Sequence, residues 1–190
     1  GNWEWMGSAL AAHGYPSTTI VKKQPNAQFT RFMNEYREMV GLDVCAIGCN
    51  EIVSAAKALK KKKLLGFLAD QDGYIHGLPV PFLGQPSSAV VGPATFAKKF
   101  GSPVVPIFTS RKPEGGHIVH ILTPLHYNNS GDDDVDMYTL TEECVRVTED
   151  FIREHPDEWI WFQHRWMTKM SEIVDYYKKL EIRERAHEKQ

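Results

Sequence analysis

Charged side chains stand at several points where the chain is expected to turn, and these are the residues that could do chemistry. Asp70 and Asp72 follow directly on an apolar run that ends at Ala69. Sites in α/β proteins are usually built at the carboxyl ends of strands, although Asp and Gly are also common turn formers. Arg111 ends another apolar run, where its fork of donors could hold a phosphate or simply be solvated.

Residues 155–166, called the aromatic segment below, have an unusual composition. They contain three tryptophans beside His164 and Arg165. Tryptophans usually indicate packing in a core, but tryptophan next to arginine also suits a membrane interface. Both interpretations stay open from composition alone.

Metal chemistry is a weaker alternative for the acids near residue 70. Asp70, Asp72 and His76 together could suggest a metal-dependent hydrolase. Their spacing fits no strong metal-binding pattern, so the sequence predicts no metal site.

The elements that must position these residues alternate between helix and strand. Phe29, Phe32 and Tyr36 recur at helical spacing before Gly41, for example, while Thr18 and its neighbours are β-branched. This alternation predicts an α/β fold with a mostly parallel central sheet flanked by helices. The expected helices are 2–12, 27–40, 50–61, 92–100, 138–154 and 171–187, and the expected strands are 18–21, 44–47, 64–69, 103–110 and 117–122.

Length and composition favour one folded domain. The chain has 190 residues, which can bury a real core, and we expect a single domain over 1–190 with a charged terminal helix at 170–190. A net charge of -2 gives no indication of a nucleic-acid partner. No apolar run approaches the ~20 residues that span a bilayer.

Taken together and in order, these segments resemble the lipid A biosynthesis acyltransferases of the late, lauroyl- or myristoyl-transferring type. The resemblance extends to about Lys169. Its pieces are Gly1-Asn2-Trp3-Glu4, Arg37 with Gly41, Ala58-Leu59-Lys60, Asp70-Gln71-Asp72, Val80-Pro81-Phe82-Leu83-Gly84, Pro103-Val104-Val105-Pro106, Arg111 and His155-Pro156-Asp157-Glu158-Trp159-Ile160-Trp161. Each piece is common by itself, but the ordered set is specific.

The resemblance implies an active site that begins before Gly1. The family signature is a histidine, four residues and an acid, and it ends in Gly-Asn-Trp-Glu, which makes Glu4 the acid. The histidine is then expected two residues before Gly1, with a membrane-anchoring helix further upstream. His13 follows the acid at the wrong spacing and does not replace it.

Further roles follow from the same resemblance. Arg37 and Asp70 match positions tied to activity, so we expect both to be catalytic with Glu4, Asp70 orienting Arg37. Arg111, Asp72 and Asn2 are expected to bind substrate. The implied fold is glycerolipid-acyltransferase-like, without cofactor or metal.

The implied activity is transfer of a fatty acyl chain to a hydroxyl of a lipid A precursor, at the cytoplasmic face of a bacterial inner membrane. Acyl carrier protein or coenzyme A would be the donor, and Lys57 with residues 60–63 could dock the acidic carrier protein. Alternatives are acyl transfer to another glycolipid, such as a phosphatidylinositol mannoside, and a non-catalytic lipid- or carrier-binding fragment. Residues 1–190 alone are expected to be inactive.

The sequence departs from the family in the aromatic segment. Where the family continues as His-Arg-Arg-Trp-Lys, this chain has Gln163, His164, Arg165, Trp166 and Met167. Roles of the first His and the final Lys therefore do not carry over.

Overall fold

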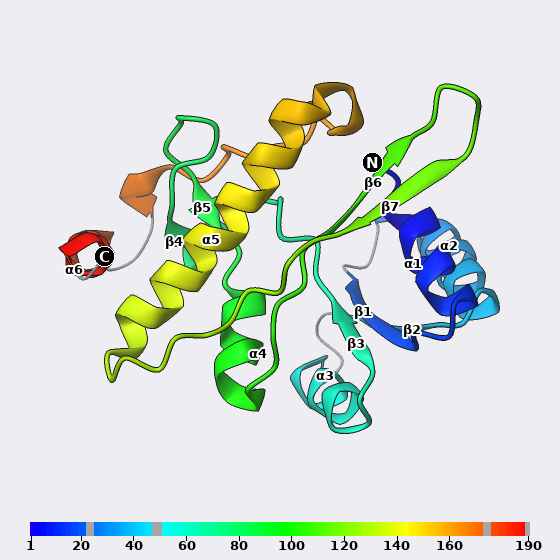
Figure 1. The fold of residues 1–190 in the computed structure, drawn as a ribbon, viewed down its shortest axis with the longest axis horizontal. Helices are drawn as coiled ribbons and strands as arrows, with labels where there is room; N and C mark the ends of the chain where they lie inside the picture. The colour runs from blue at the N-terminus through cyan, green and yellow to red at the C-terminus, as the bar shows by residue number, and fades with distance from the viewer. Residues whose placement is uncertain (22–24, 47–50, 173–175, 189–190) are drawn as a thin grey trace. The chain divides into compact units, whose positions relative to one another are not determined.

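A computed structural model describes residues 1–21, 25–46, 51–172 and 176–188 (Figure 1). The chain divides into two compact units, one formed by Asn2–Phe67 and the other by Gly1 with Leu68–Gln190. The single domain over 1–190 stays a prediction.

The N-terminal unit contains a three-stranded parallel sheet. Its strands are β1 (Ser17–Val21), β2 (Leu42–Ala46) and β3 (Leu64–Gly66), in the order β2-β1-β3. Helix α1 (Trp3–Ala12) precedes β1, while α2 (Ala27–Met39) and α3 (Glu51–Lys60) connect the strands. Parallel neighbours need such crossover connections, and the predicted alternation of helix and strand is confirmed in this unit.

The two helices that carry predicted site residues begin at asparagine caps. Asn2 accepts hydrogen bonds from the backbone N–H of Glu4 and Trp5, both at 3.2 Å. Asn26 does the same for Phe29 at 3.0 Å. These caps satisfy backbone donors that the first turn of a helix leaves unpaired. After α2, Gly41 adopts a φ of 90°, which permits the turn into β2.

The C-terminal unit is built on helices and short antiparallel pairs. Its helices are α4 (Gly92–Phe100), α5 (Asp133–Glu154) and α6 (Tyr176–Glu188), with single 3₁₀ turns at Tyr74–His76, Pro156–Glu158 and Met170–Glu172. Strand β4 (Leu78–Pro79) pairs antiparallel with β5 (Ser88–Ala89), and β6 (Ile107–Arg111) pairs antiparallel with β7 (His117–Ile121). The fold is therefore mixed α/β.

The expected mostly parallel central sheet is found only in part, because the parallel sheet has three strands and residues 107–121 pair antiparallel outside it. Strands β6 and β7 form a hairpin with each other, in register from Ile107 opposite Ile121 to Arg111 opposite His117. The physical reason is the short connection between them, in which Gly115 and Gly116 both adopt positive φ. Such a glycine-rich turn favours an antiparallel hairpin, whereas a parallel pair would need a longer crossover.

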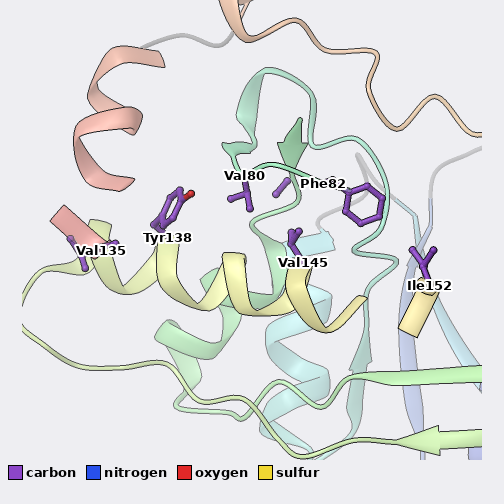
Figure 2. Close-up of a cluster of buried hydrophobic side chains, with 8 residues drawn as sticks. Val80, Phe82, Val135, Tyr138, Val145 and Ile152 are labelled. Carbon is purple, nitrogen blue, oxygen red and sulfur yellow. The ribbon is translucent and has the colours of Figure 1, made fainter. Parts of the chain in front are cut away.

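The core of the C-terminal unit lies between α5 and the segment 78–89. Figure 2 shows Val80 and Phe82 beside the α5 side chains Val135, Tyr138 and Val145, all of them buried. Helix α5 begins at Asp133, five residues before the predicted start. Asp132 caps it by accepting from the Val135 N–H at 3.3 Å, and further acids in its first turn complement the helix dipole.

Other predicted boundaries shift by a few residues. The strand expected over 64–69 ends at Gly66, and the one expected over 103–110 begins at Ile107. Ile47 and Asn50, the expected end of one strand and start of one helix, lie outside the described residues. Among the helices that the structure describes, none is both long and apolar enough to cross a bilayer.

Candidate active site

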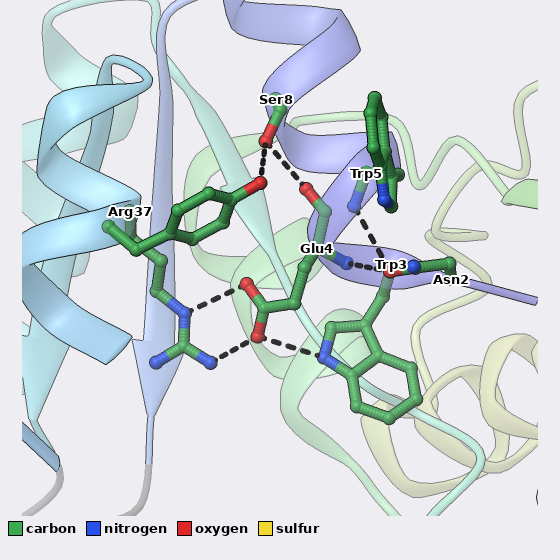
Figure 3. A network of polar contacts seen from close by, with 7 residues as sticks. Asn2, Trp3, Glu4, Trp5, Ser8 and Arg37 are labelled. Carbon is green, nitrogen blue, oxygen red and sulfur yellow. Dashed lines mark hydrogen bonds and ion pairs between the residues drawn. The ribbon is translucent and has the colours of Figure 1, made fainter. Parts of the chain in front are cut away.

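Glu4 and Arg37 form a two-point ion pair in the N-terminal unit (Figure 3). The Nε–H of Arg37 donates to Glu4 Oε2 at 3.0 Å, and its Nη2 donates to Oε1. Both side chains are largely buried, with 15% of Arg37 and 19% of Glu4 exposed. Paired, charge-assisted hydrogen bonds of this kind fix the planes of both groups, so the structure brings two predicted site residues together.

One acceptor position of the Glu4 carboxylate remains open. Oε1 accepts from Arg37 and also from the indole N–H of Trp3 at 3.2 Å. Oε2 accepts only from Arg37 among the described residues. Because a carboxylate oxygen can accept two hydrogen bonds, Oε2 can take one more donor, such as an imidazole N–H.

Local contacts hold this arrangement in place. The Ser8 hydroxyl donates to the Glu4 backbone carbonyl at 2.8 Å, which leaves its oxygen free to accept from the Tyr36 hydroxyl at 3.3 Å. Tyr36 precedes Arg37 on α2, so the contact ties the two helices together beside the ion pair. Asn2, predicted to bind substrate, uses its side-chain oxygen as the cap of α1.

Asp70 lies in the C-terminal unit, where it accepts two side-chain hydrogen bonds. The indole N–H of Trp159 donates to Asp70 Oδ2 at 2.9 Å, and the amide of Gln163 donates to the same oxygen at 3.1 Å. These donors come from the aromatic segment, 89 and 93 residues later in the chain. The expected contact between Asp70 and Arg37 stays a prediction.

Asp72 is buried and links two loops. Its Oδ1 accepts from the Tyr74 backbone N–H at 2.7 Å and from the Thr168 hydroxyl at 2.6 Å, and its Oδ2 accepts from the Thr168 N–H at 3.0 Å. With three donors on one buried carboxylate, Asp72 ties Thr168, just after the aromatic segment, to the loop after residue 70. Its predicted role in substrate binding remains a prediction.

Arg111 is anchored by two acids of the 3₁₀ turn that opens the aromatic segment. Its backbone N–H and its Nε donate to Glu158 Oε1 at 2.7 and 3.1 Å, and its Nη2 donates to Asp157 Oδ2 at 3.2 Å. Burial alone would raise the pKa of Glu158, but these hydrogen bonds and the positive charge of Arg111 outweigh burial and lower it. Two separate pieces of the predicted motif set therefore contact each other.

The lowered pKa of Glu158 predicts an acid-dependent contribution to stability. Because the folded-state pKa lies below the ordinary value of 4.5, the unfolded chain binds this proton more readily as the pH falls. The carboxylate therefore stabilises the fold above about pH 4.5, and this contribution disappears as the pH falls through the folded-state pKa. Glu158→Gln is expected to lower the melting temperature near pH 7 by about 2–4 °C, with the difference vanishing towards pH 3.

Thermal unfolding of both proteins between pH 3 and pH 7 checks this. Glu114→Gln is the matched control, because Glu114 is an exposed residue of the β6–β7 turn. A Glu158→Gln deficit that is constant across this pH range, or equal to that of the control, contradicts the assignment.

Among the charged side chains that the structure describes in the C-terminal unit, Arg165 is the most deeply buried, with 1% exposed. Its guanidinium carbon lies 4.5 Å from the centre of the Phe82 ring, and its Nη1 donates to the Ser88 carbonyl at 2.8 Å. Its Nε and Nη2 have no hydrogen-bond partner within the described part of the chain. Burial lowers the pKa of Arg165, and the nearby carboxylates of Asp72 and Asp70 oppose that effect.

The aromatic segment packs around the same ring. Trp159 and Trp166 lie 5.4 and 5.9 Å from Phe82 between ring centres, and the Trp166 N–H donates to the Phe82 carbonyl at 3.3 Å. For these two tryptophans the packing interpretation is confirmed. Trp161, by contrast, is half exposed.

Sequence reasoning missed several partners of the predicted residues. It did not identify Trp3 as a donor to Glu4, the acids that anchor Arg111, or the burial of Arg165. The order of the family pieces was a signal that these segments belong together, but it does not say which atoms meet.

Of the lysines predicted to dock acyl carrier protein, Lys63 pairs with Asp43, whereas Lys57 and Lys60 are exposed.

Comparison with known proteins agrees with the resemblance. The sequence is 27% identical over 177 residues to a phosphatidylinositol mannoside acyltransferase of Mycobacterium tuberculosis, covering 90% of this chain and 54% of that protein. The corresponding protein of Mycolicibacterium smegmatis is 26% identical over the same length, covering 56% of that protein. The chain thus spans about half the length of the curated relatives it matches.

The family model described as "Bacterial lipid A biosynthesis acyltransferase" matches residues 1–168, nearly the whole chain. That span includes the Glu4–Arg37 pair, both acids near residue 70, Arg111 and the aromatic segment. The chain therefore belongs to the bacterial lipid A biosynthesis acyltransferase family.

Proposed function

We propose that this chain is the C-terminal part of an acyltransferase that moves a fatty acyl chain from a thioester donor to a hydroxyl of a glycolipid. A lipid A precursor, a phosphorylated glucosamine disaccharide carrying hydroxyacyl chains, is the proposed acceptor. The observation that carries the proposal is the Glu4 carboxylate. Arg37 holds it at two points, and the described residues leave one acceptor position open on Oε2.

A histidine two residues before Gly1 would fill that position. Its ring N–H would donate to Glu4 Oε2, which fixes the tautomer so that the other ring nitrogen can act as a base. That nitrogen takes the proton of the acceptor hydroxyl while the oxygen attacks the thioester carbonyl. The carbon–sulfur bond then breaks, and the thiol leaves with the proton, so no acyl-enzyme is required.

Arg37 has donors left for the reaction. Its Nη1 makes no hydrogen bond within the described residues, and only one N–H of Nη2 is needed for Glu4. We propose that these donors stabilise the developing oxyanion or contact an acceptor phosphate. Asp70, Arg111, Asp72 and Asn2 are proposed to complete the site.

The proposed donor is acyl carrier protein, with coenzyme A as the alternative. Lys57 and the lysines at 60–62 are exposed at the end of α3, which suits the acidic surface of the carrier protein. These lysines also complement the dipole of α3. Replacing them raises the Michaelis constant for acyl carrier protein only if they bind that protein, so this measurement separates the two roles. We further propose that the intact protein has a glycerolipid-acyltransferase-like fold and acts at the cytoplasmic face of the inner membrane.

A second candidate acceptor is a phosphatidylinositol mannoside. The curated relatives at 26–27% identity carry that activity in their names. The proposed chemistry at Glu4 is the same for both acceptors, so only the acceptor pocket distinguishes them.

The test is an acyl-transfer assay with the intact protein, including the sequence that precedes Gly1, purified in detergent. Acyl carrier protein and coenzyme A thioesters are each offered with a lipid A precursor and with a phosphatidylinositol mannoside. We expect transfer to the lipid A precursor and none by residues 1–190 alone. Transfer only to the mannoside contradicts the acceptor, while binding of either lipid without turnover contradicts the enzyme.

A further inference from the structure

Helix α2 exposes a row of large apolar side chains. Phe29, Phe32 and Met39 are 50%, 63% and 77% exposed, and no residue of this helix is fully buried. Their spacing places Phe32 and Met39 along the same edge of the helix, with Phe29 at its start. At 1.5 Å per residue the row is about 15 Å long.

Three such side chains on one short helix form a surface that water covers poorly. If the total surface of each side chain is about 200 Å², the exposed fractions given above leave roughly 400 Å² of apolar surface in contact with water. A stable dimer needs about 800 Å² per partner, so this row is too small to hold a second copy of the chain by itself. It is large enough for the apolar face of a helix that lies in a bilayer surface.

The net charge of the N-terminal unit favours a bilayer with anionic headgroups. Residues 2–67 contain nine Lys and Arg against five Asp and Glu, a net charge of +4, while the rest of the chain carries -6. On α2 itself Arg31 is 82% exposed but pairs with Glu35, and the helix has as many acidic as basic residues. The net positive charge of the unit therefore comes from Lys22 and Lys23, which precede the helix in the sequence, and from the lysines of residues 57–63. A positive unit with an apolar helix face is complementary to anionic lipid headgroups.

We propose that the exposed row of α2, Phe29, Phe32 and Met39, binds the surface of an anionic lipid bilayer. The same helix carries Arg37 in its last turn, where it holds Glu4. Docking through α2 would therefore bring the Glu4–Arg37 pair to the level of the lipid headgroups, where the hydroxyl of a membrane lipid is found. This benefit to catalysis rests on the proposed function, but the lipid binding does not.

Vesicle sedimentation of the 190-residue chain tests the binding directly. The vesicles contain phosphatidylcholine alone or phosphatidylcholine mixed with phosphatidylglycerol. We expect binding to the anionic vesicles that weakens with added salt, and binding at least about tenfold weaker for the double variant Phe32→Ser/Met39→Ser. Both side chains are more than half exposed, so the variant is expected to keep the wild-type melting temperature.

Phe162→Ser is the matched control, because Phe162 is a 95% exposed aromatic residue in the C-terminal unit. It is expected to keep vesicle binding within about twofold of wild type. The proposal is overturned if the wild-type chain does not bind anionic vesicles, or if Phe162→Ser loses binding while the α2 variant keeps it. It is also overturned if the α2 variant turns a dimer into a monomer without a change in vesicle binding.

Activity separates this proposal from the proposed function. In the intact protein, the α2 variant is expected to transfer acyl groups normally to acceptor dispersed in detergent. If vesicle binding depends on α2 but no acceptor receives an acyl group, the proposed function is contradicted and the lipid-binding proposal stands. If acyl groups are transferred but vesicle binding does not depend on α2, the lipid-binding proposal is contradicted and the proposed function stands.

Discussion

Replacing Glu4 by alanine in the intact protein is expected to lower the turnover of acyl transfer by ~10²–10³-fold, and Arg37→Ala is expected to do the same. Glu4 lies at the start of α1 and is held at two points by Arg37. Removing the carboxylate leaves the proposed imidazole without the acceptor that fixes its tautomer. Removing the guanidinium lets the carboxylate rotate and takes away the donors proposed for the oxyanion.

The double variant Glu4→Ala/Arg37→Ala gives the sharper result. Because the two side chains act as a unit, the double variant is expected to lose about as much turnover as either single variant. Arg153→Ala is the matched control, since Arg153 is also an ion-paired arginine in the last turn of a helix, but a surface one. Losses that add up, or near-normal turnover in both single variants, contradict the assignment.

Arg165→Ala is expected to lower the free energy of unfolding by ~3–5 kcal/mol. The substitution removes the cation stacked on Phe82 and the donor to the Ser88 carbonyl, and it leaves a cavity in the aromatic segment. It also removes a positive charge that interacts electrostatically with the buried Asp72. Urea unfolding at neutral pH measures the difference.

Two further variants give this prediction its contrast. Arg165→Lys keeps the charge but not the planar group over the ring, so an intermediate loss is expected. Arg146→Ala removes an exposed arginine whose ion pair spans one turn of α5 and is expected to cost no more than about 0.5 kcal/mol. Equal stabilities of Arg165→Ala and Arg146→Ala mean that the buried guanidinium does not hold the segment.

The helices could be predicted because their signals are local. Asn2 and Asn26 are asparagine caps, Gly41 and Gly101 mark helix ends, and the aromatic residues of α2 recur at helical spacing. These signals act within one or two turns of the chain, so the sequence is enough to identify them. The start of α5 differs from the predicted one because the acids at 132–134 are common in turns as well as in first turns of helices, and Asp132 caps the helix there.

The pairing of strands β6 and β7 was also missed, although a local signal existed. Gly115-Gly116 between two apolar runs is a hairpin signal, and the connection is too short for a parallel crossover. The two predicted strands follow each other without a helix between them, so the alternation that favours a parallel sheet ends before them.

The contacts of the candidate site lie beyond local patterns. Arg37 meets Glu4 across 33 positions, and Trp159 meets Asp70 across 89. Such partners are chosen by tertiary packing, and a single sequence carries no periodicity that joins them. The family resemblance identified Glu4, Arg37 and Asp70 as candidate site residues. Only the structure shows that Arg37 donates hydrogen bonds to Glu4. It likewise shows that Trp159 and Gln163 donate to Asp70.

The pH dependence of kcat/KM in the intact protein, compared with that of Glu4→Gln, tests most directly whether Glu4 contacts the general base. A neighbouring carboxylate raises the pKa of an imidazole, so its removal is expected to move the acidic limb of the profile to lower pH by about one unit. The plateau value of kcat/KM is expected to fall by ~10²-fold or more. An acidic limb that stays in place in Glu4→Gln contradicts a contact between Glu4 and the base.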